Sequence, residues 1–251
     1  MLRLFKKTRK KLLSENKITK YLVYALGEIL LIVIGILIAL AINNWNEGRI
    51  QSQKEEFYLL GLKNEFKQSK AKLQALLEIN TANYEKARSL YLIAQDSIPD
   101  EAEIAKLVYQ SLSNEMEYNP NNSLLNELLN SGALKDISND SLRKHLTGWE
   151  SRLQSVRRQE RTLQSDRQKI LDIIRQKGDI KSIADQTGIS QQLRLPPTTP
   201  LALNAQLIRT AEFKNSLLLF ILTTEITQDT HYKPLLAEIN TLLRLIENRS
   251  F

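Results

Sequence analysis

Cysteine is absent from the 251 residues, and histidine occurs only as His145 and His231. Without cysteine the chain forms no disulfide and no thiolate metal site. The two histidines lie 86 residues apart, and neither His-Glu-x-x-His nor a calcium-loop spacing occurs. There is also no glycine-rich phosphate loop and no Gly-x-Ser-x-Gly elbow. We therefore expect no enzymatic activity, no cofactor and no metal centre.

Proline and glycine are scarce, with 6 and 8 occurrences, and the first proline is Pro99. No sustained alternation of polar and apolar residues and no hairpin dipeptide is found, so strand signals are missing. Apolar residues instead recur at spacings of three and four, which is typical of amphipathic helices. The sequence predicts an all-α fold.

Residues 21–42 form the one long apolar run, and Glu28 is its single charged side chain. A helix of this length covers about 33 Å, enough for a hydrocarbon core of about 30 Å. Ala39-Leu40-Ala41 resembles the cleavage site of a signal peptide, which is the competing interpretation. A signal peptide's apolar region usually has about 7–15 residues and this one is longer and contains an acid, so we expect an uncleaved transmembrane anchor.

Positive charge is concentrated ahead of this run. The first 20 residues carry eight Lys and Arg and one acid, whereas the other 231 residues carry 27 basic and 27 acidic side chains. Cytoplasmic flanks of spanning helices collect cations, which predicts a cytoplasmic N-terminus and a body on the other side. The tail is either this topology signal alone or a short helix on anionic lipid. The predicted membrane-surface contacts are Lys6, Lys7, Arg9, Lys10, Lys11 and Trp45. No nucleic-acid-reading module is recognisable, so we expect no nucleic-acid partner.

Four parts are predicted along the chain: a basic tail (1–20), a transmembrane helix (21–42), a long juxtamembrane helix (43–98) and a helical bundle (99–251) packing with 43–98. The long helix should reach about Gln95 and could bend at Gly48 or Gly61; its apolar register also contains Ser69, Asn80 and Asn83. Further helices are predicted at 100–118, 123–130 and 138–178, and Pro234 should interrupt the C-terminal helix. Residues 157–169 contain only Leu163 as a large apolar group and are expected to be exposed or weakly packed.

Several blocks resemble an uncharacterised family of bacterial single-span envelope proteins that is common in Bacteroidota. They are Lys-Leu-Leu-Ser-Glu-Asn-Lys (11–17), Gly-Glu-Ile-Leu-Leu-Ile-Val-Ile-Gly-Ile-Leu-Ile-Ala-Leu (27–40) and Ile-Asn-Asn-Trp-Asn-Glu (42–47). Looser similarity continues through 128–137 and 212–215. The resemblance implies a membrane anchor with a helical extracytoplasmic domain, and it implies no activity. With the charge distribution, we expect the bacterial inner membrane as the location, with the C-terminal domain in the periplasm.

Glu28 is the most costly residue in its predicted setting, because a charged acid at the centre of a span costs about 2.5–3.5 kcal/mol. Tyr24 lies one turn before it, and Gly35 and Ala39 follow on the same face as a small-x-x-x-small pair that lets helices approach. Three hypotheses compete for Glu28: a neutral, hydrogen-bonded structural acid, recognition of another membrane protein, or an ion or proton path through an oligomer.

Two polar features elsewhere have plain structural interpretations. His145 lies beside Leu142 and Leu146 and is expected to be a partly buried structural histidine. The basic run of Arg157, Arg158, Arg161, Arg167 and Lys169 is expected to be an exposed helix face, with an anionic partner as the alternative. The predicted function is a non-enzymatic, membrane-anchored interaction or scaffold subunit that associates with copies of itself or with another membrane protein; the alternative is an ion- or proton-conducting subunit using Glu28.

Overall fold

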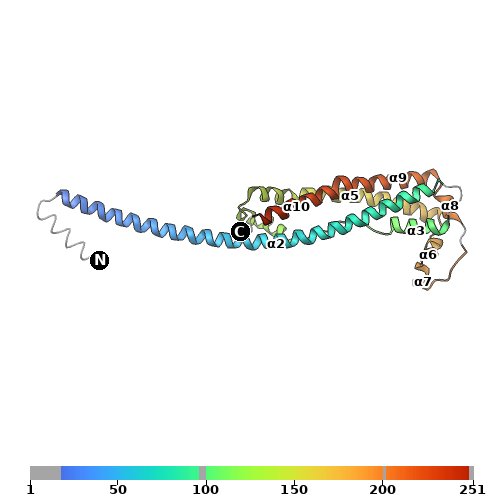
Figure 1. Cartoon of the computed structure of the whole chain (residues 1–251), viewed down its shortest axis with the longest axis horizontal. Coiled ribbons are helices and arrows are strands. Elements are labelled where there is room, and N and C mark those ends of the chain that lie inside the picture. The colour runs from blue at the N-terminus through green and yellow to red at the C-terminus, as the bar shows by residue number, and fades with distance from the viewer. Residues whose placement is uncertain (1–17, 96–99, 200–201, 249–251) are drawn as a thin grey trace. The chain divides into compact units, whose positions relative to one another are not determined.

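The computed structural model describes residues 18–95, 100–199 and 202–248, with side chains from Leu22 onward (Figure 1). Every regular element in these ranges is a helix, which confirms the all-α prediction. In chain order they are α2 (Ile18–Ile93), α3 (Glu101–Leu112), α4 (Ser123–Ser131), the 3₁₀ turn η1 (Ala133–Asp136), α5 (Asp140–Lys177), α6 (Ile180–Gln186), α7 (Ile189–Gln192), α8 (Leu203–Leu207), α9 (Ala211–Ile226), the π-helix η2 (Thr227–Tyr232) and α10 (Lys233–Glu247).

The chain divides into two units, Met1–Glu56 and Phe57–Phe251. The described part of the first unit is the N-terminal half of α2. All its large apolar side chains from Leu22 to Ile42 are exposed, by 43% to 67%. An apolar helix without a covering neighbour is stable in lipid but not in water.

The second unit is a helical bundle with one continuous core. Its long components are residues 57–93 of α2, α5, and the run α9–η2–α10, and α5 packs against that run along its length (Figure 1). The rings of Phe66 in α2 and Trp149 in α5 meet edge to face at 5.1 Å between centroids. The apolar register predicted for the long helix is buried in this core from Leu59 to Ala94. The part of α2 from Phe57 onward therefore belongs to the bundle, whereas residues 43–56 belong to the first unit.

Helix ends follow their capping residues. The Asp100, Asn139 and Thr210 side chains accept hydrogen bonds from the backbone N–H groups of the first turns of α3, α5 and α9. Gly132 ends α4 with a φ of 72°, a conformation that costs other residues energy. The predicted helices at 123–130 and 138–178 are therefore confirmed within a few residues.

The prediction for α3 was too long. The helix ends at Leu112 instead of near Tyr118, and residues 114–122 continue without regular structure. Arg167 Nε donates to the Leu112 carbonyl at 2.6 Å, and the Tyr118 backbone N–H donates to Glu160. These side chains of α5 satisfy backbone groups that a longer α3 would have paired internally.

The prediction that residues 157–169 are exposed or weakly packed was wrong. Glu160 and Asp166 lie on the buried face of α5 together with Leu163, and are 4% and 8% exposed. Counting only apolar groups missed this packing, because two acids occupy positions of the buried stripe.

Pro234 interrupts the C-terminal helix as predicted, but through a change of hydrogen-bond pattern. Residues 227–232 form the π-helix η2, and Pro234 follows in the first turn of α10. A proline in a first turn removes no intrahelical hydrogen bond. Gly61, expected as a bend, lies in unbroken helix; a Cβ there would lie 2.3 Å from Leu124 Cδ2, so it permits close packing of α4.

Candidate functional site

The exposed face of α2 in the first unit carries the stripe predicted from the sequence. At 100° per residue, Tyr24, Glu28, Gly35 and Ala39 fall within about 60° of arc. A Cβ built on Gly35 meets nothing within 4 Å, so this glycine leaves space that the rest of the described chain does not fill. Small residues of this kind allow a second helix backbone to approach closely.

Glu28 is half-buried against its own helix, and no hydrogen bond or ion pair reaches its carboxyl group from the described residues. Tyr24, one turn away, is also half-buried and has a polar interaction of its own. The helix places the two side chains on one face, as predicted. Whatever pairs with Glu28 in an apolar medium must therefore come from outside this part of the chain.

The predicted membrane-surface contacts have mixed outcomes. Lys6, Lys7, Arg9, Lys10 and Lys11 lie outside the described residues. Trp45 is 70% exposed, and the guanidinium of Arg49 lies 5.9 Å from its ring centroid. An exposed indole beside a cation, just beyond an apolar run, is typical of the interfacial belt of a membrane helix.

In the second unit, the most chemically constrained acid is Glu160, which sequence reasoning missed. Its Oε1 accepts the Tyr232 hydroxyl at 2.7 Å and the Tyr118 backbone N–H at 2.9 Å. Burial raises the pKa of Glu160, while these two hydrogen bonds partly oppose that rise. Burial, followed by the nearby Glu160 carboxylate, also raises the pKa of Tyr232. The arrangement joins α5, η2 and the segment after α3, and no described cavity opens onto it.

Further buried polar groups lie elsewhere in the core of the bundle. Asn80 Nδ2 donates to the Thr224 carbonyl at 3.1 Å, and the Thr223 hydroxyl donates to Asp166 Oδ2 at 2.7 Å. The Oδ1 atoms of Asn80 and Asn83 are buried without a donor from the described chain. Asn80 and Asn83 had been noted in the apolar register of α2, a signal that this face carries polar groups into the core.

His231 lines a hollow of about 300 Å³ between α5 and the η2–α10 junction, and His145 contacts Glu238, another residue of its lining. The lining residue Glu238 forms an ion pair with Arg152 Nε at 3.1 Å and a hydrogen bond with His145 Nδ1 at 2.7 Å. His145 is thus a partly buried structural histidine, as predicted. Desolvation, followed by repulsion from Arg158, lowers the pKa of His231 in the lining. No hydrogen bond within the described chain joins His231 to a nucleophile or an acid.

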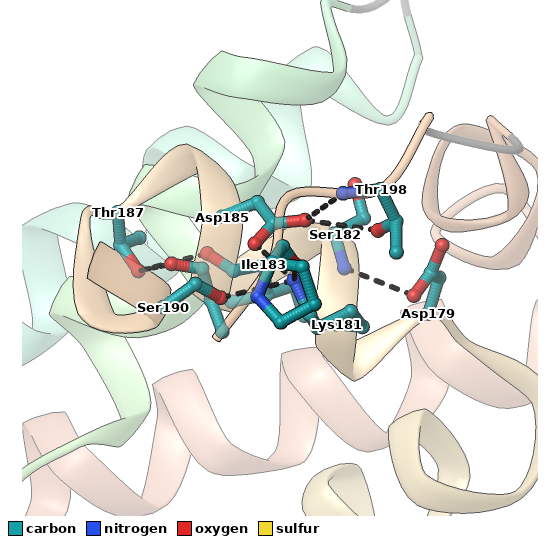
Figure 2. Close-up of polar contacts among 10 residues, drawn as sticks. Asp179, Lys181, Ser182, Ile183, Asp185, Thr187, Ser190 and Thr198 are labelled. Carbon is teal, nitrogen blue, oxygen red and sulfur yellow. Dashed lines mark hydrogen bonds and ion pairs between the residues drawn. The ribbon is translucent and has the colours of Figure 1, made fainter. Parts of the chain in front are cut away.

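Lys181 is the centre of a polar cluster that links α6, α7 and the connection after them, and sequence reasoning missed it. Figure 2 shows Asp185, Ser190 and Thr198 gathered around it. Its Nζ pairs with Asp185 and donates to Ser190 Oγ at 3.3 Å and to the Pro196 carbonyl at 2.7 Å. Asp185 Oδ2 accepts the Thr198 backbone N–H at 3.0 Å.

This cluster contains a serine beside a lysine but is not arranged for nucleophilic catalysis. The Lys181 side chain, followed by Ser190 and the backbone of Thr198, lowers the pKa of Asp185. Lys181 Nζ donates to Ser190 Oγ, whereas a general base would accept the serine's proton. Ser190 itself is 3% exposed. The contacts instead fasten residues 193–199 to α6.

The basic run on α5 divides into paired and exposed members. Arg157 and Lys169 lie 3.4 Å and 3.0 Å from Glu150 and Asp166, and Arg167 contacts the end of α3. Arg158 and Arg161 are exposed. Within the described residues, no group of three or more His, Asp or Glu side chains is placed to hold a metal ion.

The fold and these sites define an all-helical protein whose N-terminal helix is long and apolar enough to cross a membrane; by length and composition the same helix would also serve as a signal anchor. More particularly, the chain belongs to a family of unknown function (DUF6090), whose family model matches residues 28–158. The matched region begins at Glu28 and includes Gly35 and Ala39. No curated protein and no solved structure matches the chain.

Proposed function

We propose that this protein is a non-enzymatic, single-pass membrane-anchored interaction subunit. Residues 21–42 cross the bilayer, and copies of the chain associate through the stripe formed by Tyr24, Glu28, Gly35 and Ala39. The basic tail lies in the cytoplasm and the helical bundle lies outside it, in the periplasm of a bacterial inner membrane. In this arrangement the bundle is a scaffold held at the membrane surface.

The observation that carries the proposal is the complete exposure of an apolar helix segment. The large apolar side chains from Leu22 to Ile42 all face outward, and none of the most apolar 18-residue window is buried. Transfer of apolar surface out of water is worth about 25 cal/mol per Å². A segment of this size therefore needs either lipid or another apolar surface as its surroundings.

The charge distribution supports the orientation. Eight cations and one acid precede the segment, and the remaining chain is balanced. Lys and Arg near the end of a span stay on the cytoplasmic side, whereas acids have little influence. The resemblance of residues 11–17, 27–40 and 42–47 to single-span envelope proteins agrees with this orientation.

Glu28 supports the choice of a helix partner over lipid alone. Lipid tails offer no hydrogen bond, so an acid at this depth is costly unless another polar group meets it. Two parallel copies, which share the proposed orientation, bring a second Glu28 or Tyr24 within reach of the first at a close crossing. Gly35 and the small Ala39 make such a crossing sterically possible.

A matched pair of substitutions tests this proposal in the full chain. Ala39→Ile places bulk on the stripe, whereas Ala41→Ile adds the same bulk about 130° away from the centre of the stripe. The native mass of each variant is measured in detergent and in nanodiscs. We expect an oligomer for the parent chain and for Ala41→Ile, and a monomer for Ala39→Ile.

A monomeric parent chain, or equal behaviour of the two variants, contradicts self-association through the stripe. Proton flux measured in liposomes examines the conducting alternative. A flux that Glu28→Gln abolishes, with abundance and orientation unchanged, identifies Glu28 as part of a conducting path and overturns the scaffold proposal.

A further inference from the structure

A shallow basin of about 340 Å³ lies between α2 and α10 in the second unit, away from the sites described above. From α2 it is lined by Lys67, Lys70, Ala71 and Gln74, and from α10 by Asn240, Leu243, Arg244 and Glu247. The α2 members recur at helical spacing next to the buried stripe, so they form the flank that faces α10. Leu243 is buried and forms an apolar part of the lining.

The basin has a strong excess of positive charge. Glu247 is the one acid among the lining residues, and it pairs with Lys63 Nζ at 3.0 Å. A hydrogen bond and attraction from Lys63, with a smaller contribution from Lys67, lower the pKa of Glu247. Lys63 therefore neutralises the acid. Lys67, Lys70 and Arg244 have no ion pair or side-chain hydrogen bond within the described residues.

Several other cations of the bundle are paired with acids. Arg152, Arg175 and Lys233 each have a carboxylate within 3.1 Å. The hollow beside His231 likewise contains Arg152 already held by Glu238. Because the chain beyond residue 20 has equal numbers of basic and acidic residues, three cations without an ion pair around a basin that contains one acid are a local excess of positive charge. They repel one another unless an anion lies between them.

We propose that this basin binds a phosphate group, carried either by a soluble phosphate compound or by a lipid headgroup. Two ammonium groups supply point charges, and the Arg244 guanidinium supplies a planar fork that matches adjacent oxygens. Gln74 and Asn240 add amide N–H donors from the two helices. A doubly charged tetrahedral anion satisfies this donor set better than a single carboxylate does. The proposal concerns the bundle alone and does not depend on self-association of residues 21–42.

Thermal unfolding of the full chain in zwitterionic nanodiscs tests the site, with inorganic phosphate as the probe and chloride at equal ionic strength as the reference. Lys70→Gln/Arg244→Gln is compared with Lys86→Gln/Arg88→Gln, which removes the same two residue types from exposed positions of α2. We expect a saturable rise in unfolding temperature for the parent chain and for the control. The basin variant should bind phosphate at least about tenfold more weakly, since charge-assisted hydrogen bonds are lost.

The basin variant should remain folded, because removing mutually repelling cations removes no ion pair and no side-chain hydrogen bond of the described structure. Its unfolding temperature without phosphate is expected to equal or exceed that of the parent chain. The proposal is overturned if phosphate has no saturable effect beyond that of chloride, or if the two double variants lose the effect equally.

A second arm identifies the source of the phosphate group. Native mass spectrometry counts phosphatidylglycerol retained from mixed nanodiscs by the basin variant and by the control. Both keep the basic tail, so any binding of lipid by the tail cancels in the comparison. Loss of retained lipid in the basin variant alone identifies a headgroup, whereas equal retention together with the phosphate effect identifies a soluble ligand.

Discussion

Glu160 illustrates, at the scale of single residues, how polar groups specify the packing of this bundle. One carboxylate oxygen accepts hydrogen bonds from Tyr118 and Tyr232, which come from different segments. The sequence predicted the apolar positions of α5, but Glu160 and Asp166 occupy the same stripe. An acid on a helix is usually solvated, so its burial is evident only once its partners are known.

Substitution of Glu160 should show how much stability is lost when its two hydrogen-bond donors have no acceptor. Glu160→Ala leaves the Tyr232 hydroxyl and the Tyr118 N–H buried without an acceptor, at about 1–3 kcal/mol each. We expect a large fall in the unfolding temperature of the full chain, measured by circular dichroism in detergent. Phe substituted for the exposed Tyr109 should change it little. Equal effects of the two substitutions contradict the assigned role.

The pH dependence of Glu160→Gln follows from the raised pKa of Glu160. Because the folded chain holds this proton more tightly than the unfolded chain does, the contribution of Glu160 to stability is greatest at low pH. It falls as the pH rises from the ordinary value of 4.5 through the folded value. We expect Glu160→Gln to match the parent near pH 4 and to exceed it at pH 7.5. A variant that is less stable at both pH values contradicts this sign.

Lys181 gives another testable prediction at the scale of single residues, because its contacts hold the segment that follows α7 against α6. Lys181→Met removes its contacts with Asp185, Ser190 and Pro196. Residues 193–199 should then detach, and trypsin should cut faster after Arg194. A loss of about 1.4 kcal/mol in the free energy that holds this segment closed corresponds to about tenfold faster cleavage. Lys144→Met, at an exposed position of α5, is the control. Unchanged cleavage of the Lys181 variant contradicts the role.

Helices are the scale at which the sequence was most informative. The helices predicted at 123–130 and 138–178 match α4 and α5 within a few residues, because Gly132 and Asn139 decide these helix ends through their local chemistry. The end of α3 depends on Arg167 and Glu160, which lie in another helix, so local signals placed it too late. The π-helix before Pro234 was predicted only as an interruption, since its hydrogen-bond pattern depends on packing against α5.

Alanine substitutions at two glycines should change the stability of the bundle in opposite directions. Gly148 lies inside α5, and a Cβ there meets nothing within 4 Å, so Gly148→Ala should stabilise the bundle by about 0.5–1 kcal/mol. Gly132 has a φ of 72°, and Gly132→Ala should destabilise it by about 1 kcal/mol. The unfolding temperature of the full chain should therefore rise by about 1–4 °C for the first variant and fall for the second. Shifts of the same sign contradict the backbone assignment.

At the scale of the whole molecule, the sequence predicted one apolar helix followed by an all-helical body, and the structure has both. The basin around Lys70 and Arg244 was not predicted, because its cations come from segments more than 170 residues apart. The partner of the apolar stripe also has no sequence signature in a single chain. Charge, length and small residues predict that the stripe is an interface, but they do not determine the number of copies.

The association proposed for the stripe predicts a graded response at Glu28. A carboxamide makes the same kind of hydrogen bond across a helix crossing, whereas leucine makes none. We expect Glu28→Gln to retain the oligomer and Glu28→Leu to weaken it by about threefold to thirtyfold, corresponding to about 0.6–2 kcal/mol per hydrogen bond. Dilution of fluorescently labelled full chains in liposomes measures the change. A tighter oligomer for Glu28→Leu contradicts a polar contact at this position.

The most direct test of the membrane-embedded interface uses the absence of native cysteine. Single substitutions Tyr24→Cys, Glu28→Cys, Gly35→Cys and Ala39→Cys are compared with Leu26→Cys, Leu30→Cys, Leu37→Cys and Ala41→Cys in carbonate-washed vesicles. Disulfide-linked dimers should form efficiently in the first set and poorly in the second, and the protein should remain in the membrane pellet. Release of the intact chain into the carbonate supernatant, or cross-linking without helical periodicity, contradicts the account.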